Sequence, residues 1–206
     1  MTFPTSPNIL DLTRDVAAAA QMGASIGRVD QLLGEAIDIL GQLIPFDLAT
    51  VMELHGEELR VRVARGALAT EPVGRHHLEL AKYPGIRQLL QADRARPFSE
   101  RDHRDGDGDP FDGVLDLPHG HFCMVVPLQG PNETVGIMTF DRAVCGTYSE
   151  PVVALADVFG KLLATAMAFG EQSERLNRLR EQLQEQNRVL REGVSGRTLY
   201  LIHISE

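Results

Sequence analysis

The centre of the chain carries two nearly continuous apolar runs, residues 121–128 and 134–141, joined by the short segment 129–133. Apolar runs that lack polar alternation are typical of strands buried on both faces. The connecting segment contains Gly130 and Pro131, two residue types that favour turns. The sequence therefore predicts an antiparallel hairpin in the middle of a sheet that is covered on both sides.

A second hairpin is predicted upstream, with strands at residues 48–54 and 59–64 and a turn at residues 55–57. The apolar residues of its second strand are Leu59, Val61 and Val63, and they alternate with Arg60 and Arg62. Alternation of this kind predicts one buried face and one solvated face.

Apolar residues at helical spacing predict helices in residues 11–43, with a break at residues 23–27, and in residues 86–92. The segment 99–118 is rich in Asp and Gly, so we expect a long loop there. A further helix is predicted from Ser149 onwards, because helical spacing continues through to Phe169.

Beyond residue 171 the same helix changes character. Leucines occupy heptad a and d positions at Leu176, Leu179, Leu183 and Leu190, with Gln186 at one d position. Such a seam buries little area alone, so we expect a homodimer through this C-terminal helix. The whole order predicts an α+β fold: residues 1–170 form an antiparallel central sheet flanked by helices, and residues 171–206 form a coiled-coil helix and linker.

Composition limits the classes of partner. The net charge of -9 and the pI near 5.3 argue against direct nucleic-acid contact and against binding to anionic membranes. No signal-peptide pattern is present and no uninterrupted apolar run reaches roughly 18 residues, so we expect a cytoplasmic protein without a membrane span. The two cysteines do not form a Cys-x-x-Cys pair, which disfavours a disulfide framework or a thiolate zinc site.

Polar residues gather at the open end of the central hairpin. A symmetrical connection places His121 opposite Asp141, with Cβ atoms roughly 4.5–5.5 Å apart, and Cys123 opposite Thr139. His121 and Cys123 share one strand face because they are two residues apart. The sequence therefore predicts an imidazole beside a carboxylate at one edge of the sheet.

Asp109 and Asp112 lie shortly before this hairpin and can close over it. One histidine with two or three carboxylates suits ferrous iron or manganese better than zinc. The alternative is a buried hydrogen-bonded pair of His121 and Asp141 that binds no metal. Calcium is disfavoured because Pro110 stands where a calcium loop requires glycine. The remaining histidines are expected at the surface.

Three segments and the exit helix together resemble a GAF sensor domain. They read Asp-Pro-Phe-Asp-Gly at 109–113, His-Phe-Cys-Met-Val-Val-Pro-Leu at 121–128, and Val-Gly-Ile-Met-Thr-Phe-Asp at 135–141. More narrowly, they resemble the N-terminal domain of NorR-type, nitric-oxide-responsive, sigma-54-dependent transcription activators. That resemblance implies a non-haem Fe(II) that binds nitric oxide. The matching positions are Asp109, Asp112, His121 and Asp141 as metal ligands or their neighbours, with Cys123 beside them.

The resemblance also implies that the domain controls a downstream AAA+ ATPase in a full-length protein. No Walker A motif or helix-turn-helix is recognisable in these residues, so ATPase and DNA-binding activities would belong elsewhere. The family places arginines in and after the short helix, where this chain has Gly85 and Gln91, with Arg87 and Arg94 nearby. We therefore take Arg87 and Gln91 as candidate ligand-binding residues.

Three alternatives remain. A pocket lined by Phe111, Phe122, Met124, Met138 and Phe140 would suit a small organic ligand without metal. GAF-type free methionine sulfoxide reductases use cysteine chemistry, but Cys123 and Cys145 show no matching motif, so we expect no enzyme activity. The third alternative is a module that serves dimerisation only.

Overall fold

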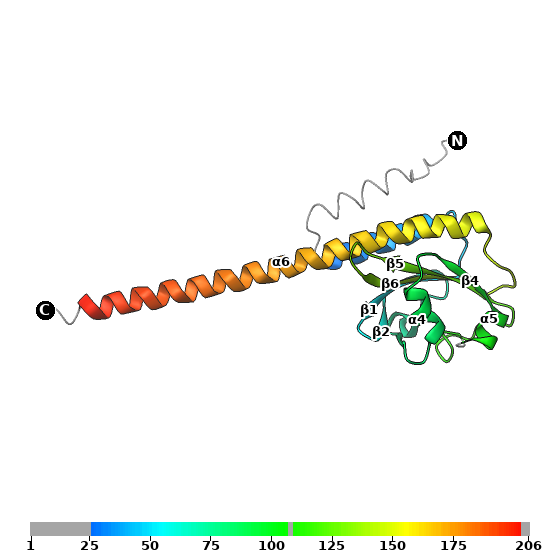
Figure 1. Ribbon diagram of the computed structural model, residues 1–206, viewed down its shortest axis with the longest axis horizontal. Coiled ribbons are helices and arrows are strands. Elements are labelled where there is room, and N and C mark those ends of the chain that lie inside the picture. Colours follow the sequence, from blue (N-terminus) through cyan, green and yellow to red (C-terminus); the bar gives the residue numbers. More distant parts are fainter. Residues whose placement is uncertain (1–25, 107–108, 203–206) are drawn as a thin grey trace, which may run out of the picture.

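A computed structural model describes residues 26–106 and 109–202, with side chains of residues 29–106 and 109–189. One antiparallel sheet carries a long helix along one face, and this helix continues far beyond the sheet (Figure 1). The strands are β1 Leu48–His55, β2 Glu58–Arg65, β3 His77–Glu79, β4 Arg96–Ser99, β5 Phe122–Gln129 and β6 Thr134–Arg142. The helices are α2 Ile26–Leu40, α3 Glu71–Gly74, α4 Pro84–Leu90, α5 Glu100–Asp105 and α6 Glu150–Ile202. The predicted helical residues 11–25 lie outside the described chain.

The six strands are ordered β3-β2-β1-β6-β5-β4, and each neighbouring pair is antiparallel. This order places the hairpin of β5 and β6 inside the sheet, which confirms the sequence prediction. One apolar cluster fills the space between the sheet and the helices α2 and α6. A second cluster lies between the opposite face and α4. Both faces of the central hairpin are therefore covered (Figure 1).

The predicted register of this hairpin is wrong by two residues. Cys123 pairs with Asp141 and Val125 pairs with Thr139, rather than His121 with Asp141 and Cys123 with Thr139. The turn is one residue shorter than predicted, because Gln129 pairs with Thr134, and a bulge next to Leu128 adds one more residue to β6. A shift of two residues leaves every side chain on its predicted face.

The prediction of a solvated face on β2 is also wrong in part. The Arg60 side chain is 62% exposed, whereas the Arg62 side chain is only 12% exposed. Arg62 is covered because α2 packs across this face of β2 and its Asp30 contacts the guanidinium. A strand pattern alone does not reveal which later or earlier helix lies over it.

The segment 99–118, predicted as a loop, contains the short helix α5. Ser99 and Asp102 form a capping box, in which each side chain bonds the backbone N–H of the other residue. This is the ordinary start signal of a helix, and its spacing is visible in the sequence. The helix brings His103 under the sheet, where it is buried.

Helix α6 runs without a break for 53 residues. It contains an 18-residue window of mean hydropathy 1.8, which by length and composition alone would suffice to cross a membrane. In the fold, the inner side of α6 packs on the sheet through residues such as Phe159, Leu163 and Met167. The apolar residues of this part thus serve the core of the domain. Farther along, Leu176, Leu179 and Leu183 are exposed.

Candidate functional site

Strand pairing brings the carboxyl group of Asp141 and the thiol of Cys123 together on one face of the sheet. Asp141 near the end of β6 lies opposite Cys123 near the start of β5, and both residues are buried. His121, the residue before β5, points to the same side because it is two residues from Cys123. The loop after α5 supplies Asp109, whose Oδ2 is 2.8 Å from Nε2 of His121. Four of the predicted site residues therefore lie in one region.

The two ring nitrogens of His121 have different surroundings. Its Nδ1 lies 3.1 Å from the carbonyl oxygen of Pro118. Its Nε2 is buried and has no well-directed hydrogen-bond partner in the described chain, although Asp109 is close. Asp109 is itself fixed, since its Oδ1 accepts the backbone N–H of Phe111 at 2.8 Å. A buried ring nitrogen without a directed partner is the atom most available to a ligand.

Asp141 is an unusual carboxyl group. Burial raises its pKa to about 8, the negative charge of Asp109 adds to this increase, and a hydrogen bond from Thr139 opposes it. The Thr139 hydroxyl donates to Oδ2 of Asp141 at 3.1 Å and lies 2.8 Å from the hydroxyl of Thr50. Asp141 is therefore mostly protonated at neutral pH, and the hydroxyl pair extends the polar site into β1.

His103 of α5 is part of this site, although the sequence analysis placed it at the surface. Its ring stacks between those of Phe98 and His121, with centroid separations of 5.7 and 5.5 Å. Its Nε2 lies 3.3 Å from Sγ of Cys123. Burial raises the pKa of Cys123 well above its usual value, and the charges of Asp141 and Asp109 add to this. The thiol is thus protonated and a poor nucleophile.

Other predicted site residues lie elsewhere. Asp112 is exposed, and Phe111 packs in a separate apolar cluster with Leu48 and Val73. Phe122 points to the α6 side of the sheet and contacts Tyr148, with ring centroids 5.0 Å apart. Met124, Met138 and Phe140 belong to the same core cluster. Four of the five residues of the expected apolar pocket therefore pack in one core cluster on the α6 side of the sheet, and Phe111 lies apart from them.

The two candidates near the short helix are also remote from His121. Arg87 is exposed and forms an ion pair with Glu57 in the β1–β2 turn. Gln91 is exposed at the end of α4. Gly85, near the start of α4, lines a small cavity of about 110 Å³ together with Arg96, Phe98 and His103. The Arg96 guanidinium lies over the Phe98 ring, with its Cζ atom 4.8 Å from the ring centroid.

The donor atoms are of the types that bind hard divalent cations, but they are not arranged to hold one. His121 Nε2 and Asp109 Oδ2 are adjacent, and Asp141 supplies a second carboxyl group nearby. Within the described ranges, however, no three His, Cys, Asp or Glu side chains stand close enough to hold a metal ion. Binding a metal here requires that Asp109 or Asp141 move and that Asp141 lose its proton.

Comparison with solved structures supports the fold. The GAF domain of a phosphoenolpyruvate-protein phosphotransferase from Coxiella burnetii has a TM-score of 0.60 and 17% identity, covering 84% of this chain and 99% of that one. The phycoerythrobilin-bound GAF domain of a cyanobacterial phytochrome has a TM-score of 0.64 and 12% identity, covering 82% of this chain and 100% of that one. A GAF domain/HD domain protein from Geobacter sulfurreducens has a TM-score of 0.59 and 14% identity, covering 72% of this chain and 95% of that one.

No protein of curated function matches the sequence closely enough to suggest a more specific role. The family model described as GAF domain matches residues 28–168, which span α2, the whole sheet and the part of α6 that packs on it. This range contains every residue of the site described above. The chain therefore belongs to the GAF domain family, whose members are regulatory sensor and signalling domains.

Proposed function

We propose that this GAF domain senses a small ligand at the group formed by His121, Asp109 and Asp141. One observation carries the proposal: the buried Nε2 of His121 lacks a directed hydrogen bond although a carboxylate stands 2.8 Å away. A ligand that gives this nitrogen a well-directed partner would therefore be stabilised in the site. Asp141, buried and mostly protonated, can either donate a hydrogen bond or lose its proton to a bound cation.

The finer proposal is that the ligand is nitric oxide, bound through Fe(II). Support comes from the donor types, since one imidazole and two carboxylates suit ferrous iron, and from the sequence resemblance to NorR-type regulators. His121 and Asp109 would hold the iron, and Asp141 would join them after losing its proton. The iron would supply a site that binds nitric oxide. His103 and Phe98 would exclude water from one side of it.

Anaerobic reconstitution with ferrous iron tests this proposal. We expect one iron per chain and, after addition of nitric oxide, an electron paramagnetic resonance signal that free iron in the same buffer does not give. His121→Ala should abolish both, because it removes the nitrogen ligand. Gln91→Ala is the control, since Gln91 is exposed at the end of α4. Iron binding that persists in the His121→Ala variant would contradict the assignment.

A second candidate ligand is a small organic molecule bound without metal. The cavity beside His103 favours it, because Arg96 and His103 give polar contacts and Phe98 and Ile86 give apolar ones. Phe98→Ala should then weaken binding of such a ligand to metal-free protein. A panel of small carboxylates and phenols, followed by thermal unfolding at equal concentrations, measures this. No stabilisation by any of them, together with iron binding, would favour the metal site.

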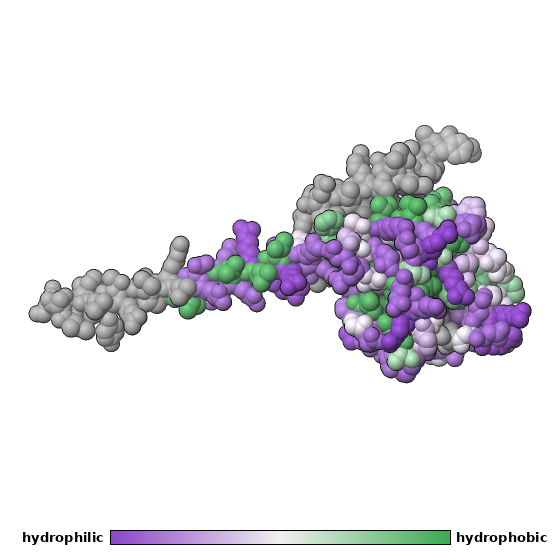
Figure 2. Space-filling model, in the orientation of Figure 1, coloured by the Kyte–Doolittle hydropathy of each residue, from purple (hydrophilic) through white to green (hydrophobic). Residues whose placement is uncertain are grey.

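We further propose that α6 forms a homodimer. The heptad seam predicted at Leu176 and Leu183 continues back along the domain through residues 169, 162 and 155, every seventh being Leu or Phe. Leu176 is 66% exposed and Leu183 is 58% exposed. Figure 2 shows the apolar residues of this projecting segment among hydrophilic neighbours. A second copy would cover the seam by knobs-into-holes packing.

Leu183→Glu should convert the dimer to a monomer, because it places like charges across the seam. Analytical ultracentrifugation measures the change, and Glu185→Gln, off the seam, should leave the dimer intact. A monomeric wild-type chain at micromolar concentration would contradict the proposal.

The proposed output is an AAA+ ATPase in a sigma-54-dependent transcription regulator, reached through α6, in the cytoplasm. The geometry suits this use, because α6 packs on the sensing domain and projects away from it (Figure 1). We propose no catalysis by this domain, since the thiol of Cys123 is buried and its pKa is raised. The net charge of -9 also disfavours direct DNA contact.

A further inference from the structure

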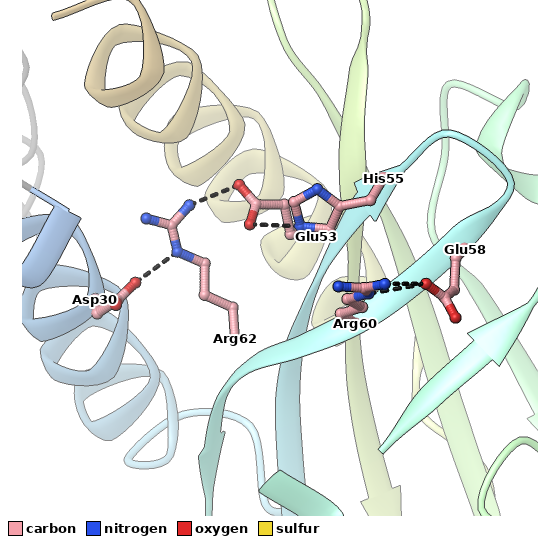
Figure 3. Close-up of polar contacts among 6 residues, drawn as sticks. All are labelled: Asp30, Glu53, His55, Glu58, Arg60 and Arg62. Carbon is pink, nitrogen blue, oxygen red and sulfur yellow. Dashed lines mark hydrogen bonds and ion pairs between the residues drawn. The ribbon is translucent and has the colours of Figure 1, made fainter. Parts of the chain in front are cut away.

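A cluster of charged side chains joins three elements where α6 leaves the sheet. Arg62 of β2 donates from Nε to Oδ1 of Asp30 in α2 at 2.5 Å, and from Nη1 to Oε1 of Glu53 in β1 at 2.8 Å (Figure 3). The side chains of Arg62 and Glu53 are 12% and 16% exposed, so water and salt screen this ion pair weakly. Arg62 thus ties the hairpin of β1 and β2 to α2.

The same turn of α2 contacts α6. A Cβ atom added at Gly170 would lie 2.7 Å from Cγ2 of Val29, so α2 approaches α6 closely because residue 170 is glycine. Val29 precedes Asp30, the residue that binds Arg62. Helix α2 therefore contacts both Arg62 and α6 through neighbouring residues of one turn.

Beyond Gly170 most of the described residues between α6 and the hairpin of β1 and β2 are charged. An open cleft of about 710 Å³ lies between α6 and the hairpin of β1 and β2. Its lining residues are Asp30, Glu53, His55, Arg62, Glu171, Glu174, Arg175, Arg178 and Leu179. Charged side chains consequently make up most of the surface between this stretch of α6 and the hairpin.

The charges around Arg62 are unbalanced. Burial and the neighbouring Glu53 raise the pKa of Glu171, with a contribution from Glu133, and Arg62 opposes the increase. Without the Arg62 guanidinium, Asp30, Glu53 and Glu171 would repel one another across the cleft. Removing Arg62 costs more than its pair with Glu53 contributes, because the largely buried Glu53 then loses its compensating charge.

Strand β1 connects this cluster to the candidate ligand site. Thr50 points to the face of the sheet that carries the candidate ligand site. Its hydroxyl contacts that of Thr139, which in turn donates to Asp141. Glu53 points to the opposite side, towards α2 and α6, because it is an odd number of residues away. One strand therefore has the ligand site on one face and the Arg62 cluster on the other.

We propose that the Arg62 cluster is a releasable ion-pair clasp that fixes the angle at which α6 leaves the domain. With the clasp closed, α6 continues rigidly from the sheet. With the clasp open, α6 pivots near Gly170, where its apolar contact with α2 ends. The use of this motion in signalling rests on the proposed sensing function, but the clasp itself does not.

Distances between two nitroxide labels, measured by double electron–electron resonance in metal-free protein, test the proposal. One label replaces Lys82, exposed after β3, and the other replaces Glu181, exposed on α6, in a Cys145→Ser background. Labelled chains are diluted with unlabelled chains so that only distances within one protomer are detected. We expect a narrow distance distribution, and Arg62→Met should at least double its width.

Arg60→Met is the matched control, because Arg60 lies on the same strand, is 62% exposed and pairs with Glu58 instead of Asp30 or Glu53 (Figure 3). It should leave the width unchanged. Asp30→Asn, which removes one of the two carboxylates, should give an intermediate width without lowering the melting temperature of the domain. This variant keeps the test valid if Arg62→Met does not fold.

Unchanged widths in Asp30→Asn, or equal broadening in Arg60→Met, would overturn the clasp. Loss of iron or nitric oxide binding would not bear on this measurement, since the labelled protein contains neither. The failure of the sensing proposal and the failure of the clasp are therefore distinguishable.

Discussion

Replacing Asp141 by Asn should change how the stability of the domain depends on pH. The pKa of Asp141 is raised from its usual value of 3.8 to about 8 in the folded protein. The folded state therefore keeps a proton that the unfolded state loses, and wild-type stability falls as pH rises between these two values. Asparagine resembles the protonated acid in shape and does not titrate, so the variant lacks this pH dependence.

The size of the effect follows because the folded state binds one proton more than the unfolded state in this pH range. Each pH unit in this window contributes about 1.4 kcal/mol to the difference in the free energy of unfolding. Between pH 5 and pH 7 the Asp141→Asn variant should therefore gain about 2.7 kcal/mol relative to wild type. The gain should level off above pH 8, where wild-type Asp141 is ionised in both states.

Urea unfolding in the presence of a chelator, followed by circular dichroism, measures this difference at pH 5, 6, 7 and 8. Circular dichroism is suitable because the chain contains no tryptophan. Asp112→Asn is the matched control, since it makes the same replacement at an exposed aspartate. If the difference between the Asp141→Asn variant and wild type does not change with pH, Asp141 is ionised in the folded protein and the description of the site is wrong.

Two further predictions concern the sheet and the thiols. Gly136→Ala should destabilise the domain by more than about 2 kcal/mol in urea unfolding, because the backbone there has φ 157° and a Cβ atom would lie 2.0 Å from the carbonyl oxygen of Met52. Gly56→Ala, at a turn with open space around it, should cost less despite its positive φ. In native protein, Ellman's reagent should modify the exposed Cys145 rapidly and the buried Cys123 only on unfolding; rapid modification of both would contradict the burial of the site.

Sequence patterns were sufficient for the central hairpin, the α+β class and the long exit helix. These features depend on the alternation and spacing of apolar residues over many positions, which tertiary packing reinforces. The hairpin register was not predictable in the same way. A symmetrical five-residue turn and a shorter turn followed by a bulge give the same apolar pattern on both faces.

The site residues that sequence reasoning missed depend on tertiary packing. His103 is buried because α5 places it under Cys123, and the capping box of Ser99 and Asp102 was the available signal for that helix. Arg62 is buried because α2 lies over β2. Phe122 could have been excluded from the sequence, since it alternates with His121 and Cys123 along the strand.

The most direct test of the sensing site compares two carboxylates of one loop. Both Asp109 and Asp112 match the motif of the resemblance, but Asp109 contacts His121 while Asp112 is exposed. Ferrous iron binding, measured anaerobically by metal analysis after gel filtration, should be lost in Asp109→Asn and kept in Asp112→Asn. Equal binding by both variants, or loss only in Asp112→Asn, would contradict the assignment of the ligand site to His121 and Asp109.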